Sequence, residues 1–317
     1  IAIYYLFLNN FISNLKFNNL IIFSIFTPIF VLYPIAEIEV LARKETFLYC
    51  FFLLYLLLDN KTHKNIYKLT ILPLAILVWE PVIFFFPFWV IIDFFEQNER
   101  NITKSLFNII IFYLPAIFLA FFIAFNPISS EGHKEMANFL KNEFNETCYM
   151  SCDLLLHKSK ITEQITAVFD LFTIERIIRY LLILLVGFGP LIILIQYSKF
   201  KKFNAKIVSL FVSVPIIVLF LMMTDWGRTV NMYYTFSILT FLYLFKKNYL
   251  KLNQLYKQNF FLKLLKTKKL LIIFFIIFCF GWNPKTSMVG DVGSKPGYQI
   301  PRKALKIIYF KYIKNNY

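Results

Sequence analysis

Charged residues stand in three short clusters beside or inside apolar segments, where a charge is costly. The first cluster, Arg43-Lys44-Glu45, comes directly before the apolar run Thr46–Leu58. Two adjacent cations can hold a diphosphate, and a neighbouring carboxylate keeps them oriented. The alternative is an ordinary flank whose long cationic side chains reach from an apolar layer to its surface. Arg43, Lys44 and Glu45 are therefore candidates for binding phosphate.

The second cluster is a single carboxylate at a helix breaker. Glu80 lies between Trp79 and Pro81, with a phenylalanine-rich run after it. An acid in such an apolar setting marks a candidate functional site and is suited to general acid or base catalysis. The alternative is a structural carboxylate that hydrogen-bonds the broken helix at Pro81.

The third cluster, Asp225-Trp226-Gly227-Arg228, connects two strongly apolar runs and is predicted to be a tight turn. An Asp–Arg pair on a short turn can position a phosphate or a sugar hydroxyl, and Trp226 can contact the substrate. The alternative is a turn stabilised by its own ion pair, with Trp226 as an interfacial anchor. Asp225 and Glu80 are the candidate catalytic residues.

The composition indicates the setting of these clusters. The 317 residues are 59% hydrophobic and 20% aromatic, which would expose too much apolar surface in a soluble protein. Helices of about 20 apolar residues can cross a bilayer with their backbone hydrogen bonds satisfied internally. The net charge of +16 comes from lysines beside the apolar runs, so it indicates topology and contact with anionic lipids, not nucleic acid.

The predicted fold is all-α, a polytopic transmembrane helix bundle in a single integral membrane domain over residues 1–317. The first residues, Ile1-Ala-Ile-Tyr-Tyr-Leu-Phe-Leu, resemble the end of a span, so we expect the sequence to be N-terminally truncated. The predicted spans are Leu20–Ala36, Thr46–Leu58, Leu69–Trp79, Pro81–Phe95, Ser105–Phe125, Ile177–Tyr197, Ile207–Met223, Thr229–Phe245 and Leu270–Phe280.

Lysine-rich loops set the predicted orientation. Lys199–Lys206 carries four lysines and no acid, and Lys246–Lys269 carries eight lysines and no acid, so both are expected in the cytoplasm. Asp59–Lys68 is also expected there. Leu69–Phe95 is then too short for two full crossings, and we expect two half-helices that meet at Glu80. One long kinked span is the alternative.

The remaining segments are predicted to lie on the far side. Residues 126–176 form one large periplasmic loop, in which Ile161–Ile178 has the periodicity of an amphipathic surface helix. A disulfide between Cys148 and Cys152 is possible, and His133 and His157 have no metal-ligand spacing. Residues 281–317 are a C-terminal tail whose side of the membrane stays open. No metal site or other cofactor is expected.

The three clusters, the half-helix pair and the far-side charges resemble the GT-C glycosyltransferase superfamily and the O-antigen and exopolysaccharide polymerases. The residues that carry this resemblance are Arg43-Lys44-Glu45, Trp79-Glu80-Pro81 and Asp225-Trp-Gly-Arg228. The resemblance implies a bacterial inner-membrane enzyme that transfers a sugar or oligosaccharide from a polyprenyl-(di)phosphate carrier at the periplasmic face. The acceptor would be a glycan or a lipid-linked acceptor, with membrane lipids as further partners.

The resemblance also implies roles for these residues. Arg43, Lys44 and Arg228 would neutralise the diphosphate leaving group, and Asp225 or Glu80 would accept the acceptor's proton. A multi-pass transporter or flippase for a lipid-linked or anionic substrate is the competing prediction, because broken helices with a buried acid also occur in transporters. A non-catalytic membrane subunit is a third.

Overall fold

The computed structural model is almost entirely helical over the residues that it describes. These are residues 1–13, 15, 18–36, 44–97, 102–126, 128–148, 161–201, 204–223, 225–252 and 268–282. The helices of the first half are α1 (Ala2–Ile12), α2 (Asn19–Ile25), α3 (Tyr33–Ala36), α4 (Glu45–Leu57), α5 (Lys61–Val78), the 3-10 helix η2 (Glu80–Phe85), α6 (Phe86–Glu96), α7 (Ile102–Ile110), the 3-10 helix η3 (Ile111–Tyr113) and α8 (Leu114–Phe125). Those of the second half are α9 (Ser130–Phe144), α11 (Ile161–Asp170), α12 (Ile174–Gln196), α13 (Ala205–Met222), α14 (Trp226–Lys246) and α16 (Lys268–Phe280).

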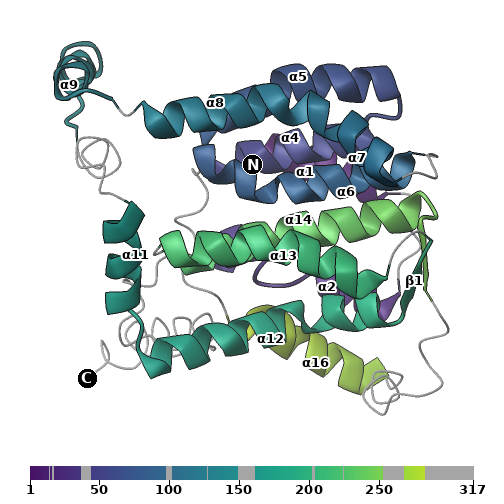
Figure 1. Cartoon of the computed structure of the whole chain (residues 1–317). Helices are drawn as coiled ribbons and strands as arrows, with labels where there is room; N and C mark the ends of the chain where they lie inside the picture. The colour runs from purple at the N-terminus through teal and green to yellow at the C-terminus, as the bar shows by residue number, and fades with distance from the viewer. Residues whose placement is uncertain are drawn as a thin grey trace, which may run out of the picture.

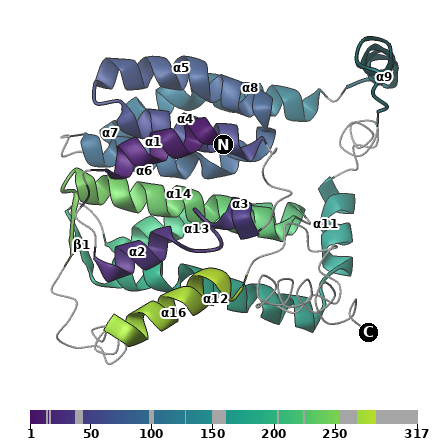
Figure 2. The same ribbon diagram turned by 180° about the vertical axis from the view of Figure 1, so that it is seen from behind.

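Most of these helices run side by side, and α11 lies across their ends (Figures 1 and 2). At the opposite end, β1 (Ser198–Phe200) and β2 (Leu250–Leu252) pair as a short antiparallel ribbon. We call these two ends the α11 end and the ribbon end. Helix α14 runs between them through the core, is buried along most of its length and packs against α4, α6, α12 and α13.

The predicted break at Glu80 is present between α5 and α6. Trp79 is extended, and η2 begins at Glu80 with Pro81 in its first turn, where the missing proline N–H is tolerated. Lys64 in the first turn of α5 pairs with Glu96 at the end of α6, and Lys68 Nζ, one turn further along α5, lies 2.8 Å from Asp93 Oδ2. The arms are therefore antiparallel, and both reach the ribbon end, but α5 has 18 residues and is longer than the predicted half-helix Leu69–Trp79. The description of this pair as half-helices in a membrane stays a prediction.

The prediction of a loop at Asp59–Lys68 is wrong, because α5 begins at Lys61. The Asn60 side chain accepts a hydrogen bond from the backbone N–H of Thr62 and caps the helix. The lysines of this stretch were interpreted as loop residues because of their charge. Lys64 and Lys68 are instead buried in the helix, since each is paired with an acid of α6.

Proline also divides two of the predicted spans. Leu20–Ala36 is not one helix: α2 ends at Ile25, turns follow around Pro28, and α3 covers only four residues. Ser105–Phe125 passes through η3 just before Pro115, which cannot donate a backbone hydrogen bond. The periodicity of apolar residues does not show where a helix is interrupted or changes to a 3-10 helix.

Two predictions near the α11 end are also corrected. The amphipathic helix Ile161–Ile178 is two helices, because α11 ends at Asp170 and the Thr173 hydroxyl caps the start of α12. The turn predicted at Asp225–Arg228 is mostly helix, since α14 begins at Trp226. Residues 37–43, which include Arg43, and the C-terminal tail from residue 283 lie outside the described residues.

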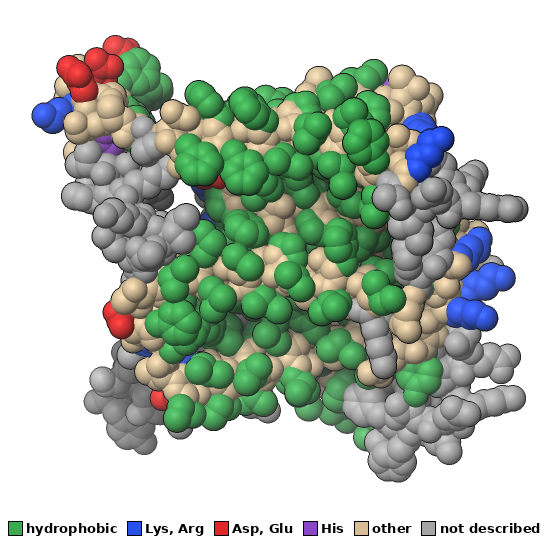
Figure 3. All heavy atoms as spheres, in the orientation of Figure 1, with side chains coloured by type: hydrophobic (Ala, Val, Ile, Leu, Met, Phe, Trp, Pro, Cys, Tyr) green, Lys and Arg blue, Asp and Glu red, His purple; other side chains and the backbone are tan. Residues whose placement is uncertain are grey.

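Two helical segments, Lys104–Phe125 and Ile174–Gln196, are long and apolar enough to cross a membrane. Only 22% and 35% of their most apolar windows are buried, unlike the core helices of a soluble protein. The other apolar helices that pass this composition test are shorter, so the number of membrane crossings stays a prediction. The surface in Figure 3 shows hydrophobic side chains across the bundle, with lysine and arginine at the ribbon end and most acidic side chains at the α11 end. The all-helical class is confirmed, and the polytopic membrane arrangement stays a prediction.

Candidate functional site

The first and third clusters meet at the α11 end. Glu45 begins α4, and Arg228 lies in the first turn of α14. The Arg228 guanidinium donates one hydrogen bond to Glu45 Oε1 and another to Asp225 Oδ2. The Glu45 side chain is only 4% exposed, whereas that of Asp225 is 27% exposed. Arg228 therefore joins the starts of two helices that are far apart in the sequence.

Lys44 and Glu80 lie within electrostatic reach of this ion pair. Glu45, Glu80 and Arg228 all act on the ammonium of Lys44. Lys44 is exposed, and partial desolvation of its ammonium lowers its pKa, while Glu45 and Glu80 oppose this shift and Arg228 adds to it. Five predicted site residues thus lie in one region of the α11 end: Lys44, Glu45, Glu80, Asp225 and Arg228.

Within the described part of the chain, Glu80 is the carboxylate of this site that is available for chemistry. It is exposed, and no hydrogen bond or ion pair joins it to another described residue. It therefore does not hydrogen-bond the helix break at Pro81, which was the structural alternative for this residue. A free carboxylate at a surface shared with Lys44 can accept a proton from a polar ligand.

Arg228 is less available to a ligand than the sequence suggested. Its charge is matched by two carboxylates, and its side chain is only 16% exposed. The described part of the site holds three carboxylates against two cations, so Lys44 is the cation that remains for a phosphate. Arg43 lies outside the described residues.

Two polar atoms in this cluster have no hydrogen-bond partner. They are Glu45 Oε2 and Arg228 Nε, and both are buried. An unsatisfied buried donor or acceptor costs about 1–3 kcal/mol, which a water or a ligand hydroxyl would offset. Glu45 Oε2 can accept a hydrogen bond and Arg228 Nε can donate one, and both atoms lie within the site.

Trp226 does not face this site. Its ring is buried against Phe172, Tyr180 and Phe220, and its indole N–H donates to the Phe220 carbonyl at 2.9 Å. This environment assigns Trp226 to packing of the helix ends and not to the predicted contact with substrate.

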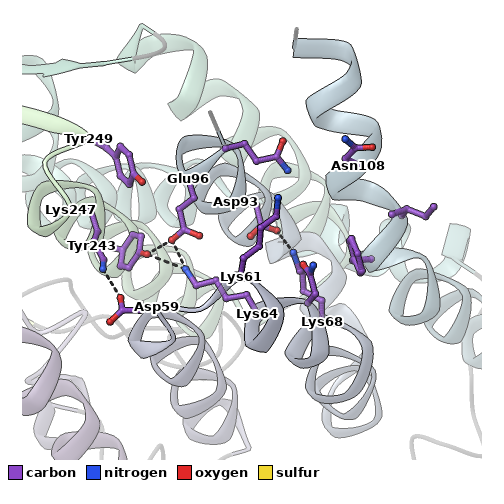
Figure 4. Close-up of a pocket in the computed structure, with 14 residues that line it drawn as sticks. Asp59, Lys61, Lys64, Lys68, Asp93, Glu96, Asn108, Tyr243, Lys247 and Tyr249 are labelled. Carbon is purple, nitrogen blue, oxygen red and sulfur yellow. Dashed lines mark hydrogen bonds and ion pairs between the residues drawn. The ribbon is translucent and has the colours of Figure 1, made fainter. Parts of the chain in front are cut away.

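The structure has a second polar site, at the ribbon end, which the sequence patterns above do not predict. A cavity of about 880 Å³ opens there between α5, α6, η3 and the end of α14, with one residue of α7 at its edge (Figure 4). Lys64 pairs with Glu96, and Lys68 pairs with Asp93, both inside the bundle. The signal was present, because Asp93 and Glu96 interrupt an apolar run and the two lysines are four residues apart, on one face of a helix.

The described residues contain no group of three His, Cys, Asp or Glu side chains that could hold a metal ion. Cys148 is in a disulfide, and its sulfur lies 3.4 Å from His133 Nε2, whereas Cys50 and Cys279 are free thiols. Cys152 and His157 lie outside the described residues.

Comparison of the chain with family models, curated proteins and solved structures finds no match in any of the three. The site must therefore be interpreted from its own geometry.

Proposed function

We propose that this protein is a membrane glycosyltransferase or polysaccharide polymerase that uses a polyprenyl-(di)phosphate sugar donor at the α11 end. The observation that carries the proposal is the exposed Glu80 carboxylate near Lys44, which has no ion-pair partner among the described residues. The ion pairs of Arg228 with Glu45 and Asp225 hold the neighbouring helix starts in place. These groups come from three separate elements, and their meeting is not required by any local turn.

The proposed reaction uses one carboxylate and one cation. Glu80 accepts the proton of the acceptor hydroxyl as its oxygen bonds to the anomeric carbon of the donor sugar. The bond between that carbon and the phosphate oxygen breaks, and Lys44 stabilises the charge on the leaving phosphate. Asp225 is held by Arg228, so Glu80 is the better of the two predicted bases.

The apolar surface supports a membrane setting for this chemistry. The helices that carry the most apolar windows expose most of those windows, and α11 lies across the bundle as a helix on a membrane surface would. A polyprenyl tail could then reach the α11 end from within the bilayer. These features support the membrane setting, and the bacterial inner membrane is the location that the proposed donor implies.

Replacement of Glu80 tests the proposal directly. Glu80→Gln should lower the transfer of labelled sugar from a polyprenyl-linked donor by about 100-fold or more, because a general base typically contributes that much. Glu131→Gln, which removes an exposed acid from α9, is the matched control and should leave transfer unchanged. Unfolding temperatures of both variants should match the parent. Full transfer by the Glu80→Gln variant would exclude this acid as the base.

A transporter or flippase is the second candidate, favoured by the ion pairs buried between the two arms of the broken α5–α6 hairpin. Purified protein in vesicles, supplied with a labelled polyprenyl-linked donor and an acceptor, distinguishes the two. Release of the carrier phosphate with formation of a new glycosidic product supports transfer. Movement of the intact donor to the other leaflet supports transport.

A further inference from the structure

We propose that the cavity at the ribbon end is a binding site for a phosphate-bearing ligand, either a lipid headgroup or a soluble phosphate compound. It lies at the opposite end of the bundle from Glu80, so this proposal does not depend on the proposed function. Four lysines line it, and they come from two helices that are distant in the sequence: Lys61, Lys64 and Lys68 of α5 and Lys247, which follows α14 (Figure 4).

The inner acids of the cavity are already saturated by the protein. Asp93 accepts hydrogen bonds from Tyr55, from Tyr113 at 2.9 Å and from Lys68 at 2.8 Å. Glu96 accepts from Lys64 and Tyr243. These groups neutralise each other and form the floor of the cavity, so they leave no unmatched negative charge to attract a cation.

The outer lysines are available at the mouth. Lys61 is exposed and has no acidic partner among the described residues. Lys247 pairs with Asp59, whose side chain is 79% exposed, and a solvent-exposed pair of this kind contributes little and opens readily. The cavity therefore carries one more cation than acid, and two of its ammonium groups can reach an incoming anion.

The start of α5 adds to the attraction for an anion. Lys61 is the first residue of this 18-residue helix, and the N-terminal turn of a helix carries partial positive charge, although Asn60 already accepts a hydrogen bond from the Thr62 N–H here. The two outer ammonium groups provide the donors that a phosphate group requires, and the charge of this turn adds to the attraction.

The walls of the cavity allow two routes of entry. Ile111 and Phe112 form an apolar side, and Ile111 is 48% exposed on the outer surface of the bundle. A lipid could place its headgroup among the lysines with its chains along this side. A soluble phosphate compound would enter from the lysine-rich end instead.

Binding to the full chain in a neutral detergent tests the proposal, with phosphatidylglycerol in mixed micelles as one probe and inorganic phosphate as the other. The double variant Lys61→Gln/Lys247→Gln should bind about tenfold or more weakly than the parent, because both available cations are removed. The matched control, Lys134→Gln/Lys141→Gln, removes two lysines from α9 at the other end and should leave binding unchanged.

The two probes identify the source of the ligand. Retention of phosphatidylglycerol, counted by native mass spectrometry, with no effect of inorganic phosphate supports a lipid headgroup. Saturable binding of inorganic phosphate without lipid supports a soluble ligand. The proposal is wrong if the parent binds neither probe, or if the Lys61→Gln/Lys247→Gln variant binds as the parent does. Its unfolding temperature should be unchanged, since both side chains are exposed.

Discussion

At the scale of single residues, Arg228 explains why the α4 and α14 starts lie together. It holds Glu45, which is almost fully buried, and Asp225, which is partly exposed. The resemblance implies only a role for Arg228 in binding the diphosphate. The structure adds a role in folding, because removal of the guanidinium leaves a buried carboxylate without its cation.

We therefore predict that Arg228→Ala destabilises the protein by about 3 kcal/mol, since breaking a buried ion pair leaves an uncompensated charge. Thermal unfolding in detergent measures the loss. Asp225→Asn should cost less than about 1 kcal/mol, because Arg228 keeps Glu45 as its buried partner. The double variant Glu45→Gln/Arg228→Gln should recover part of the loss, and an Arg228→Ala variant as stable as the parent would contradict the assigned role.

The candidate site residues could be predicted from the sequence where a charged residue stands within or beside an apolar run. Lys44, Glu80 and Arg228 were found because each interrupts or borders an apolar run. Their partners could not be predicted, because a contact such as Glu45 with Arg228 spans 183 positions and depends on how the helices pack. Asp93 and Glu96 also interrupt an apolar run, but Lys64 and Lys68, which pair with them, have the lysine pattern of a cytoplasmic loop and do not reveal this pairing in the sequence.

At the scale of elements, the α5–α6 hairpin is held by charges rather than by apolar contacts alone. Lys64 and Lys68 face Glu96 and Asp93 in an order that only antiparallel arms allow. The tyrosines of α4, η3 and α14 donate to the same two acids, so the network connects the hairpin to three further elements.

We predict that Lys68→Met lowers the unfolding free energy by about 3–5 kcal/mol, because Asp93 would then be buried without a cation. Adding Asp93→Asn should restore part of it, since an amide oxygen can still accept from Tyr55 and Tyr113. Lys61→Met is the control on the same helix and should change stability by no more than about 0.5 kcal/mol. If Lys61→Met and Lys68→Met lower the free energy of unfolding equally, the buried Lys68–Asp93 ion pair does not have the stabilising role assigned to it.

Trp226 allows a second prediction at this scale. It packs against rings from the α11–α12 connection, α12 and α13, so Trp226→Ala should cost about 3–5 kcal/mol by leaving a cavity. Trp226→Phe should retain most of the packing and lose the hydrogen bond to Phe220, at about 1 kcal/mol. If Trp226 contacted substrate instead, the alanine variant would keep its unfolding temperature and lose only transfer activity.

The runs of apolar residues predict that helices are present, but they predict most of the helix boundaries poorly. The run that became α4 was placed within a residue at each end, because it is uniformly apolar and ends at a polar loop. The start of α5 was missed because a lysine-rich stretch can be either a loop or a helix whose charges are paired. The ion pairs of Lys64 and Lys68 with α6 decide between these outcomes, and they form only in the folded protein.

At the scale of the whole molecule, the two ends differ in charge. The ribbon end carries lysines on β1, β2 and the chain around them, including Lys199 and Lys251, which lie opposite each other in the ribbon. The α11 end carries the acids of α9 and the Glu45–Arg228–Asp225 ion pairs. If the bundle sits in a membrane, the excess of lysine places the ribbon end in the cytoplasm and the Glu80 site on the far side.

This orientation predicts the accessibility of single cysteines, in a background where the four native cysteines are replaced. Lys141→Cys on α9 should react with an impermeant thiol reagent in intact spheroplasts, and Lys199→Cys on β1 should react only after the membrane is opened. Both side chains are on exposed positions, so a lack of reaction reports the barrier and not burial. The reverse pattern would place Glu80 and Lys44 in the cytoplasm, where a nucleotide-linked sugar could replace the lipid-linked donor. Reaction of both before lysis would mean that no membrane separates the two ends, and the apolar surface of α8 and α12 would then require a protein partner to cover it.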